Sequence, residues 1–145
     1  MALSDFIPTD GQHRIAQAIT EAEKRTSGEI CVHVTPHCRG AAMKRATAAF
    51  NRLQLYRTAR RNAVLIYVAY LDHKLAILGD VGIDSRVDEG FWDEAVALLT
   101  QRISAGRQVD GLCETIALVG EQLQSIFPAE RDDVNELSNE VTYED

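Results

Sequence analysis

Carboxylates and glycines gather directly after an apolar run, in the segment Gly79–Asp84. Asp80 and Asp84 flank Gly82 there, and Glu29 opens an earlier apolar run. Hard cations bind several oxygen ligands, and carboxylates on a glycine-containing loop supply them. The spacing is not that of an EF-hand. We therefore predict a Ca²⁺ or Mg²⁺ site made by Asp80, Asp84 and Glu29; the alternative is that Asp80 caps a turn and Asp84 stabilises the loop.

A second set of residues suits a phosphate group. Arg61 and Asn62 stand immediately before the longest apolar run. A guanidinium binds phosphate oxygens in a two-pronged arrangement, and an amide adds a further donor. The alternative is a solvated basic surface. A general base or a nucleophile in a recognisable setting does not accompany this pair, so the sequence alone does not predict catalysis.

The histidines and cysteines form only a weak metal set. His37, Cys38, Asp72 and His73 fall in two segments that the predicted topology brings to the other end of the sheet. A structural zinc site needs four converging ligands at characteristic spacings, and this spacing is not one of them. A zinc site is therefore the less favoured interpretation of these residues.

The cysteine pattern bears on the compartment. Cys31, Cys38 and Cys113 are odd in number and lack CxxC spacing, so we expect three free thiols and a reducing, cytoplasmic setting. The first residues show neither a basic flank nor a sustained apolar run, so we expect no signal peptide. No apolar stretch approaches the roughly 20 residues that a membrane span needs.

Hydrophobic periodicity predicts the elements that position these residues. β-branched and aromatic runs predict a strand over 29–35, a second over 64–70 and a third over 75–78 after a polar turn at 71–74. Apolar stripes with helical spacing predict helices over 9–26, 41–55, 88–106 and 110–128. The helix between the first two strands indicates a right-handed βαβ unit, and the polar turn indicates a hairpin.

This order predicts an α/β fold, a three-layer α/β/α sandwich with a small mixed central sheet, as one domain over residues 1–128. If the first two strands are parallel and the third is antiparallel, Glu29, Asn62 and Asp80 lie at the same end of the sheet. The topology therefore favours a polar site at that end.

Charge divides the chain into a basic segment and an acidic tail. Residues 129–145 carry seven acids and one base, which accounts for −6 of the net charge of −7. Residues 30–71 contain no acid, and seven cations lie there. We expect the tail to dock electrostatically on a basic surface; the competing outcome is that Leu137, Val141 and Tyr143 insert into a groove. A protein partner could bind through the basic helix 41–55 or the tail, whereas the overall acidity excludes a dedicated nucleic-acid binder.

The segment Arg61–Ile66 resembles the RNGVLI-type strand of the TPM domain family, which is related to the thylakoid lumen acid phosphatase. The resemblance covers roughly residues 10 to 140 and continues through Ala76–Ile83, Phe91-Trp92, Gly106, Gly111-Leu112, Gly120-Glu121 and Phe127-Pro128. Residues 132–140 are similar to the NELPNE-like ending of short, unanchored members, with Ser138 where proline is common.

The resemblance implies an α/β/α sandwich, with phosphatase activity in some members and calcium binding in others. Two functions follow. We favour a divalent-cation (calcium)-binding module that mediates protein interaction. The alternative is a weak metal-dependent, acid phosphatase-like hydrolase of phosphate monoesters, in which Asp80, Asp84 and Glu29 hold the cation while Arg61 and Asn62 orient the phosphate.

Overall fold

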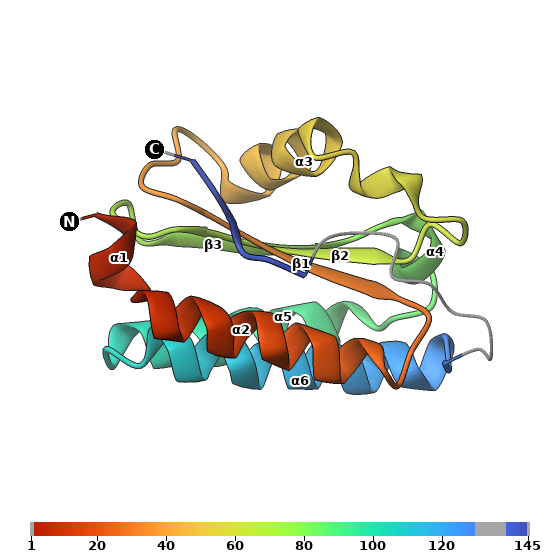
Figure 1. Cartoon of the computed structure of the whole chain (residues 1–145). Helices are drawn as coiled ribbons and strands as arrows, with labels where there is room; N and C mark the ends of the chain where they lie inside the picture. The colour runs from red at the N-terminus through yellow and green to blue at the C-terminus, as the bar shows by residue number, and fades with distance from the viewer. Residues whose placement is uncertain (1, 130–138, 145) are drawn as a thin grey trace.

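The computed structural model describes residues 2–129 and 139–144. The elements in chain order are α1 (Leu3–Phe6), α2 (Thr9–Glu23), β1 (Glu29–Thr35), α3 (Ala42–Arg52), the 3₁₀ turn η1 (Leu55–Arg57), β2 (Ala63–Ala69), β3 (Lys74–Gly79), α4 (Val81–Asp84), α5 (Glu89–Ser104), α6 (Gln108–Ile126) and β4 (Thr142–Tyr143). Helix α3 covers one face of the sheet, and α2, α5 and α6 cover the other (Figure 1). The predicted three-layer α/β/α sandwich is confirmed.

The sheet has the order β3-β2-β1-β4. Strands β1 and β2 are parallel, as the predicted βαβ unit requires, and β3 runs antiparallel to β2. The boundaries of β1 match the prediction, because Glu29 and Thr35 both lie at its ends. Every residue of β1 and of β2 is buried, which explains why the sequence of β2 is a continuous apolar run.

Alternate residues of the central strands build two separate cores. Ile30, Val32 and Val34 of β1 pack in the larger cluster, which α2, α5 and α6 complete. Cys31 of the same strand packs in the smaller cluster beneath α3, together with Phe50. Because side chains alternate between the two faces of a strand, one seven-residue strand anchors both layers.

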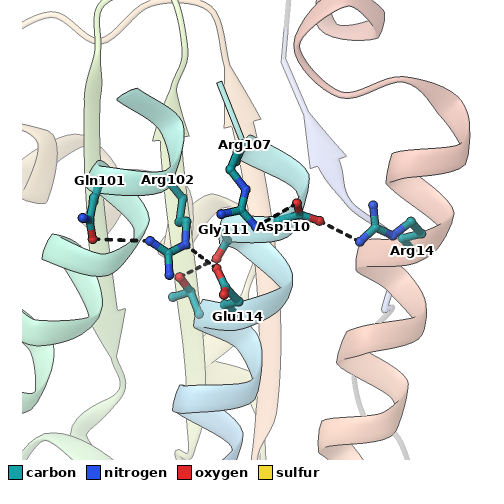
Figure 2. A network of polar contacts seen from close by, with 8 residues as sticks. Arg14, Gln101, Arg102, Arg107, Asp110, Gly111 and Glu114 are labelled. Carbon is teal, nitrogen blue, oxygen red and sulfur yellow. Dashed lines mark hydrogen bonds and ion pairs between the residues drawn. The ribbon is translucent and has the colours of Figure 1, made fainter. Parts of the chain in front are cut away.

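The helices of the larger layer are joined by close backbone approach and by surface ion pairs (Figure 2). A Cβ at Gly111 would lie 2.5 Å from the Cβ of Arg102, so α5 and α6 pack at this distance only because Gly111 has no side chain. The Arg102 guanidinium reaches Glu114 with an Nε–Oε2 distance of 2.7 Å, and Asp110 binds Arg14 at 2.9 Å. Solvent screens exposed pairs of this kind, so packing carries most of the stability of this layer.

The C-terminal residues form part of the packed domain, which corrects the expectation of purely electrostatic docking. Val141 is buried in the larger core, and Thr142–Tyr143 pairs with β1 at His33 and Val34. The tail is dominated by charged residues, but a buried apolar side chain and backbone pairing with β1 decide where it lies. One electrostatic contact does exist, because Arg52 Nη2 lies 3.0 Å from Glu144 Oε1. Of the other two predicted anchors, Tyr143 is 59% exposed and does not insert, and Leu137 lies outside the described residues.

The same strand encloses a histidine. His33 is buried, its Nδ1 lies 2.7 Å from Thr142 Oγ1, and its Nε2 lies 3.3 Å from Glu144 Oε2. Its ring stacks against Tyr67 with centroids 6.1 Å apart. Burial lowers the pKa of His33 below its usual 6.5, although the Glu144 carboxylate acts in the opposite direction.

Three further findings bear on the sequence predictions. The three cysteines are free, as expected. Residues 81–84, expected as a loop, form the short helix α4. No helix in the described ranges is both long enough and apolar enough to cross a bilayer.

Replacing Val141 by Asp should lower the free energy of unfolding by about 3 kcal/mol, because it places a charge without a partner in the core. Tyr143→Asp is the matched control: Tyr143 lies two residues away on the same segment and is 59% exposed, so its replacement should cost less than about 1 kcal/mol. Chemical denaturation at low and high salt measures both. Equal effects, or a loss that salt abolishes, would contradict a packed C-terminal strand.

The lowered pKa of His33 predicts a pH dependence with a definite sign. Below pH 6.5 the unfolded chain binds a proton at this residue before the folded chain does, so stability should fall as pH decreases through that window. His33→Gln should reduce the slope between pH 6.5 and the folded pKa. Denaturant midpoints at several pH values provide the measurement, and an unchanged slope in the variant would assign the titration to another group.

Candidate functional site

The register confirms that three predicted site residues share one end of the sheet. Glu29 pairs with Ala63, and Asp80 follows β3 and donates its backbone N–H to the Ala63 carbonyl at 2.9 Å. Asn62 immediately precedes β2, and its carbonyl accepts the Glu29 N–H at 3.2 Å. This is the end of the sheet beside α4 in Figure 1.

An ion pair between Arg61 and Asp80 dominates one part of this end. Arg61 Nε lies 2.7 Å from Asp80 Oδ2 and its Nη2 lies 2.9 Å from Oδ1, which is the two-pronged geometry of a strong guanidinium–carboxylate pair. The Asp80 side chain is 4% exposed, whereas that of Arg61 is 47% exposed. The bonded carboxylate raises the pKa of Arg61. Asp80 is therefore a buried charge with its counter-charge beside it.

The backbone around this pair explains its geometry. Arg61 has a φ of +52°, a left-handed conformation that is unusual outside glycine. Gly82 donates its N–H to the Arg61 carbonyl at 2.9 Å, and a Cβ on Gly82 would collide with the carbonyl oxygens of Arg60 and Arg61. Asp80 Oδ1 also accepts the Val81 N–H at 2.7 Å. Asp80 thus caps α4, as the alternative interpretation of the loop held.

These contacts limit Asp80 as a cation ligand. Both of its carboxylate oxygens already bind donors of Arg61, whose positive charge would oppose a second cation. Asp84 lies exposed on α4. Within residues 2–129 and 139–144, no group of three or more His, Cys, Asp or Glu side chains is placed to hold a metal ion. The joint site of Asp80, Asp84 and Glu29 stays a prediction.

Glu29 instead contacts a second carboxyl group, that of Glu23. Glu29 is 3% exposed, and its side chain hydrogen-bonds that of Glu23. Glu23 Oε2 accepts the Ile30 N–H at 2.8 Å. Burial first, and the Glu29 charge in addition, raises the pKa of Glu23 to about 9. The protonated form of Glu23 is therefore favoured at neutral pH.

The C-terminal segment reaches this carboxyl pair. Asn139 donates to Glu23 through its side chain, and its Nδ2 lies 3.0 Å from Thr20 Oγ1. Residues 139–144 thus contact the pair at one end and His33 at the other.

Asn62 contributes buried polar atoms without partners. The residue is 1% exposed, and neither Oδ1 nor Nδ2 has a hydrogen-bond partner within the described part of the chain. The hydroxyl of Ser27 is in the same condition. An unpaired buried polar group costs roughly 1–3 kcal/mol, and ordered water or a ligand commonly satisfies one. The Asn62 amide and the Ser27 hydroxyl could therefore each form further hydrogen bonds, as donors and as acceptors.

The weak zinc set lies at the opposite end. Asp72 Oδ1 is 3.0 Å from His37 Nδ1, and Asp72 Oδ2 accepts the Cys38 N–H at 2.7 Å. His73 is exposed, with a φ of +55°. Hydrogen bonds to His37 and Cys38 lower the pKa of Asp72. The carboxylate ties the hairpin to the loop after β1, which is a sufficient structural reason for its presence.

Glu23 and Ser27 were not among the predicted site residues. One signal for Glu23 exists in the sequence: an acid in the last turn of a helix opposes the helix dipole, so it needs a compensating reason. Here the reason is the Ile30 N–H, which the short β4 leaves without a strand partner. Ser27 carries no comparable signal.

Comparison with known proteins gives the family and the fold of the chain. A sequence model of the TPM domain matches residues 2–122. The NMR structure of the BA42 protein from the psychrophilic bacterium Bizionia argentinensis is 35% identical, covers 96% of each chain and superposes with a TM-score of 0.89. The N-terminal domain of the cg2496 protein from Corynebacterium glutamicum is 14% identical, covers 88% of this chain and 80% of its own, and has a TM-score of 0.64, which shows a shared fold alone. No protein with a curated description matches the chain.

The sequence model spans most of the chain, and the BA42 protein resembles it over nearly its whole length. The chain therefore belongs to the TPM domain family.

Proposed function

We propose that this protein is a non-catalytic binding module that takes up one divalent cation, Ca²⁺ or Mg²⁺, with Glu29 and Glu23 as its carboxylate ligands. The observation that supports the proposal is the buried contact between these two carboxyl groups. Two carboxylates held together repel each other and retain a proton, and a divalent cation can replace that proton while neutralising both charges.

The surrounding oxygens suit a hard, weakly held cation. Asn139 contacts Glu23 through its side-chain amide, whose oxygen is a common Ca²⁺ ligand. Two carboxylates are few for a calcium site, and Glu23 Oε2 is already bound to the Ile30 N–H. We therefore expect a dissociation constant of roughly 10⁻⁴ to 10⁻³ M, with water completing the coordination shell.

The proposal links the cation to a protein partner. Asn139 begins the described C-terminal segment, and Glu144 near its end pairs with Arg52 of α3. A cation at Glu23 would change the hydrogen bond from Asn139 that anchors this segment. If Glu144 then moved away from Arg52, more of the basic face of α3 would be exposed. Lys44 and Arg45 are exposed on the same helix, so an acidic protein surface is the partner of matching charge.

The alternative function remains a weak metal-dependent hydrolase of phosphate monoesters. The unpartnered amide of Asn62 and the half-exposed guanidinium of Arg61 favour it. Against it, Asp80 already binds Nε and Nη2 of Arg61 and offsets the guanidinium charge, which makes Arg61 a weaker phosphate ligand. Turnover of a generic phosphate monoester that is lost on chelation and in Asn62→Ala would favour the hydrolase over the module.

The cation prediction is tested by calorimetry and NMR on chelator-treated full-length protein. Ca²⁺ or Mg²⁺ should bind once and should first shift the amides of Glu23 and of residues 29–30. Because Glu23 holds a proton at neutral pH, binding at pH 7 should release about one proton, which titrations in buffers of different ionisation enthalpy will count. Glu29→Gln should weaken binding about tenfold.

Asp84→Asn is the matched control, since it removes one exposed carboxylate near the same sheet end. It should leave the affinity unchanged within experimental scatter. If Asp84→Asn and Asp80→Asn weaken binding while Glu29→Gln does not, the site lies on the α4 loop. Absence of saturable binding at millimolar Ca²⁺ and Mg²⁺ would exclude the cation-binding module.

The raised pKa of Glu23 predicts a second, metal-independent result. Between pH 4.5 and about 9 the folded state holds a proton that the unfolded state has released, so stability should fall as pH rises through this range. Glu23→Gln mimics the protonated acid. It should flatten that slope and stabilise the protein at pH 8 by on the order of 1 kcal/mol, or about 2–4 °C in Tm. If Glu23→Gln is destabilised and its stability depends on pH as in the wild type, both Glu23 and Glu29 are ionised in the folded protein.

A further inference from the structure

A large hollow lies at the hairpin end of the sheet, opposite the carboxyl pair. It measures about 730 Å³ and is lined mainly by apolar side chains, including Phe6, Tyr70, Leu75, Val96 and Ile103. Pockets of about 300–1,000 Å³ with apolar walls and a few polar groups are typical of sites for small molecules. Its size and lining therefore mark it as a candidate ligand site.

Four separate parts of the chain form the walls. The end of α1, the β2–β3 hairpin, the start of α3 with Gly40, and the last turns of α5 all contribute. Phe6 and Tyr70 stack with ring centroids 5.0 Å apart, and Gln108 Nε2 holds the Phe6 carbonyl at 2.8 Å. The apolar wall is thus held in place by packing and by a tertiary hydrogen bond.

The formal charge in the lining of this pocket is positive. Lys74 belongs to the lining, His73 lies beside it, and no Asp or Glu is found among the described lining residues. The Lys74 ammonium donates to the carbonyls of Cys38 and Gly40 at 3.2 and 2.7 Å. These carbonyls fix its position without cancelling its charge, and an ammonium group has a third N–H to donate.

The nearest acid in the sequence does not neutralise this pocket by direct contact. Asp72 uses one oxygen on His37 and the other on the Cys38 N–H, and it is not part of the lining. The edge of β3 adds a further donor. Because the Asp80 N–H points to β2, alternation directs the N–H of Leu75 to the outer edge, where β3 has no neighbouring strand in the described sheet.

We propose that this pocket binds a small amphipathic anion, a molecule with an apolar body and a single carboxylate or phosphate head. The apolar body would lie against Phe6, Val96 and Ile103, and the head would accept hydrogen bonds from Lys74 and the edge of β3. Charge complementarity selects an anion over a neutral or cationic molecule of the same shape, because the lining carries the Lys74 ammonium and no described acid.

Decanoate is the probe for the full-length protein, with decylammonium and acetate as controls. Decanoate should produce saturable NMR shifts at Phe6, Tyr70–Leu75 and the last turns of α5. Decylammonium has the same chain with the opposite charge and should bind at least about five-fold more weakly. Acetate lacks the apolar body and should produce no saturable shift in the millimolar range.

Two pairs of variants separate the apolar and the charged parts of the site. Thr100→Trp should block the pocket, because Thr100 is an exposed lining residue of α5; Ala97→Trp, exposed one turn earlier on α5 and outside the lining, should bind decanoate normally. Lys74→Gln should weaken decanoate about five-fold, and Lys74→Arg should restore most of that affinity. Circular dichroism shows whether each variant folds.

Three results would overturn the proposal: no saturable decanoate binding, equal affinity for decylammonium, or undiminished binding in Thr100→Trp. Decanoate shifts centred on Glu29 and Asn62 would also overturn it, since they would place the anion at the other end of the sheet. The outcome is independent of the proposed cation function, because chelation should leave decanoate binding unchanged and Glu29→Gln should not affect it.

Discussion

The fold depends on satisfying the backbone of β1, a strand whose seven residues are all buried. Its inner edge pairs with β2 along the full length, from Glu29 to Thr35. Its outer edge pairs with β4 only at His33 and Val34, so other groups must satisfy the remaining buried donors. The Glu23 carboxyl does so for the Ile30 N–H. Because β4 has only two residues, it leaves part of the outer edge of β1 unpaired, and Glu23 is held beside Glu29 to satisfy that edge.

The same constraint places titratable groups inside the protein. Glu23 is drawn into the interior beside Glu29, and the pKa of Glu23 rises; His33 is enclosed by β4 and Tyr67, and its pKa falls. Both shifts favour the neutral form of the group, as burial requires. The Glu23 shift lowers the free energy of unfolding as pH rises, and the His33 shift lowers it as pH falls. The proposed cation site uses the acidic one of these two groups.

Strong local patterns made much of this arrangement predictable. Alternating apolar residues identified β1 and a continuous apolar run identified β2, and the helix between them implied parallel pairing, which placed Glu29, Asn62 and Asp80 at one end. What the sequence did not reveal depends on contacts between distant segments. The pairing of Thr142 with His33 spans 109 positions, and the left-handed backbone at Arg61 that turns its side chain onto Asp80 has no signal in the residue type. The strong negative charge of the tail also obscured its buried residue Val141.

The long sequence separation between β1 and β4 has a consequence for biosynthesis. A ribosome delivers β1, α3 and β2 long before residues 139–144 emerge, and domains begin to fold during synthesis. Through that interval the outer edge of β1 lacks its strand partner, and an exposed strand edge invites pairing with other chains. The sheet is therefore completed only after synthesis has passed β4, so a chain that stalls or is released before that point would differ from the folded domain by an open β1 edge.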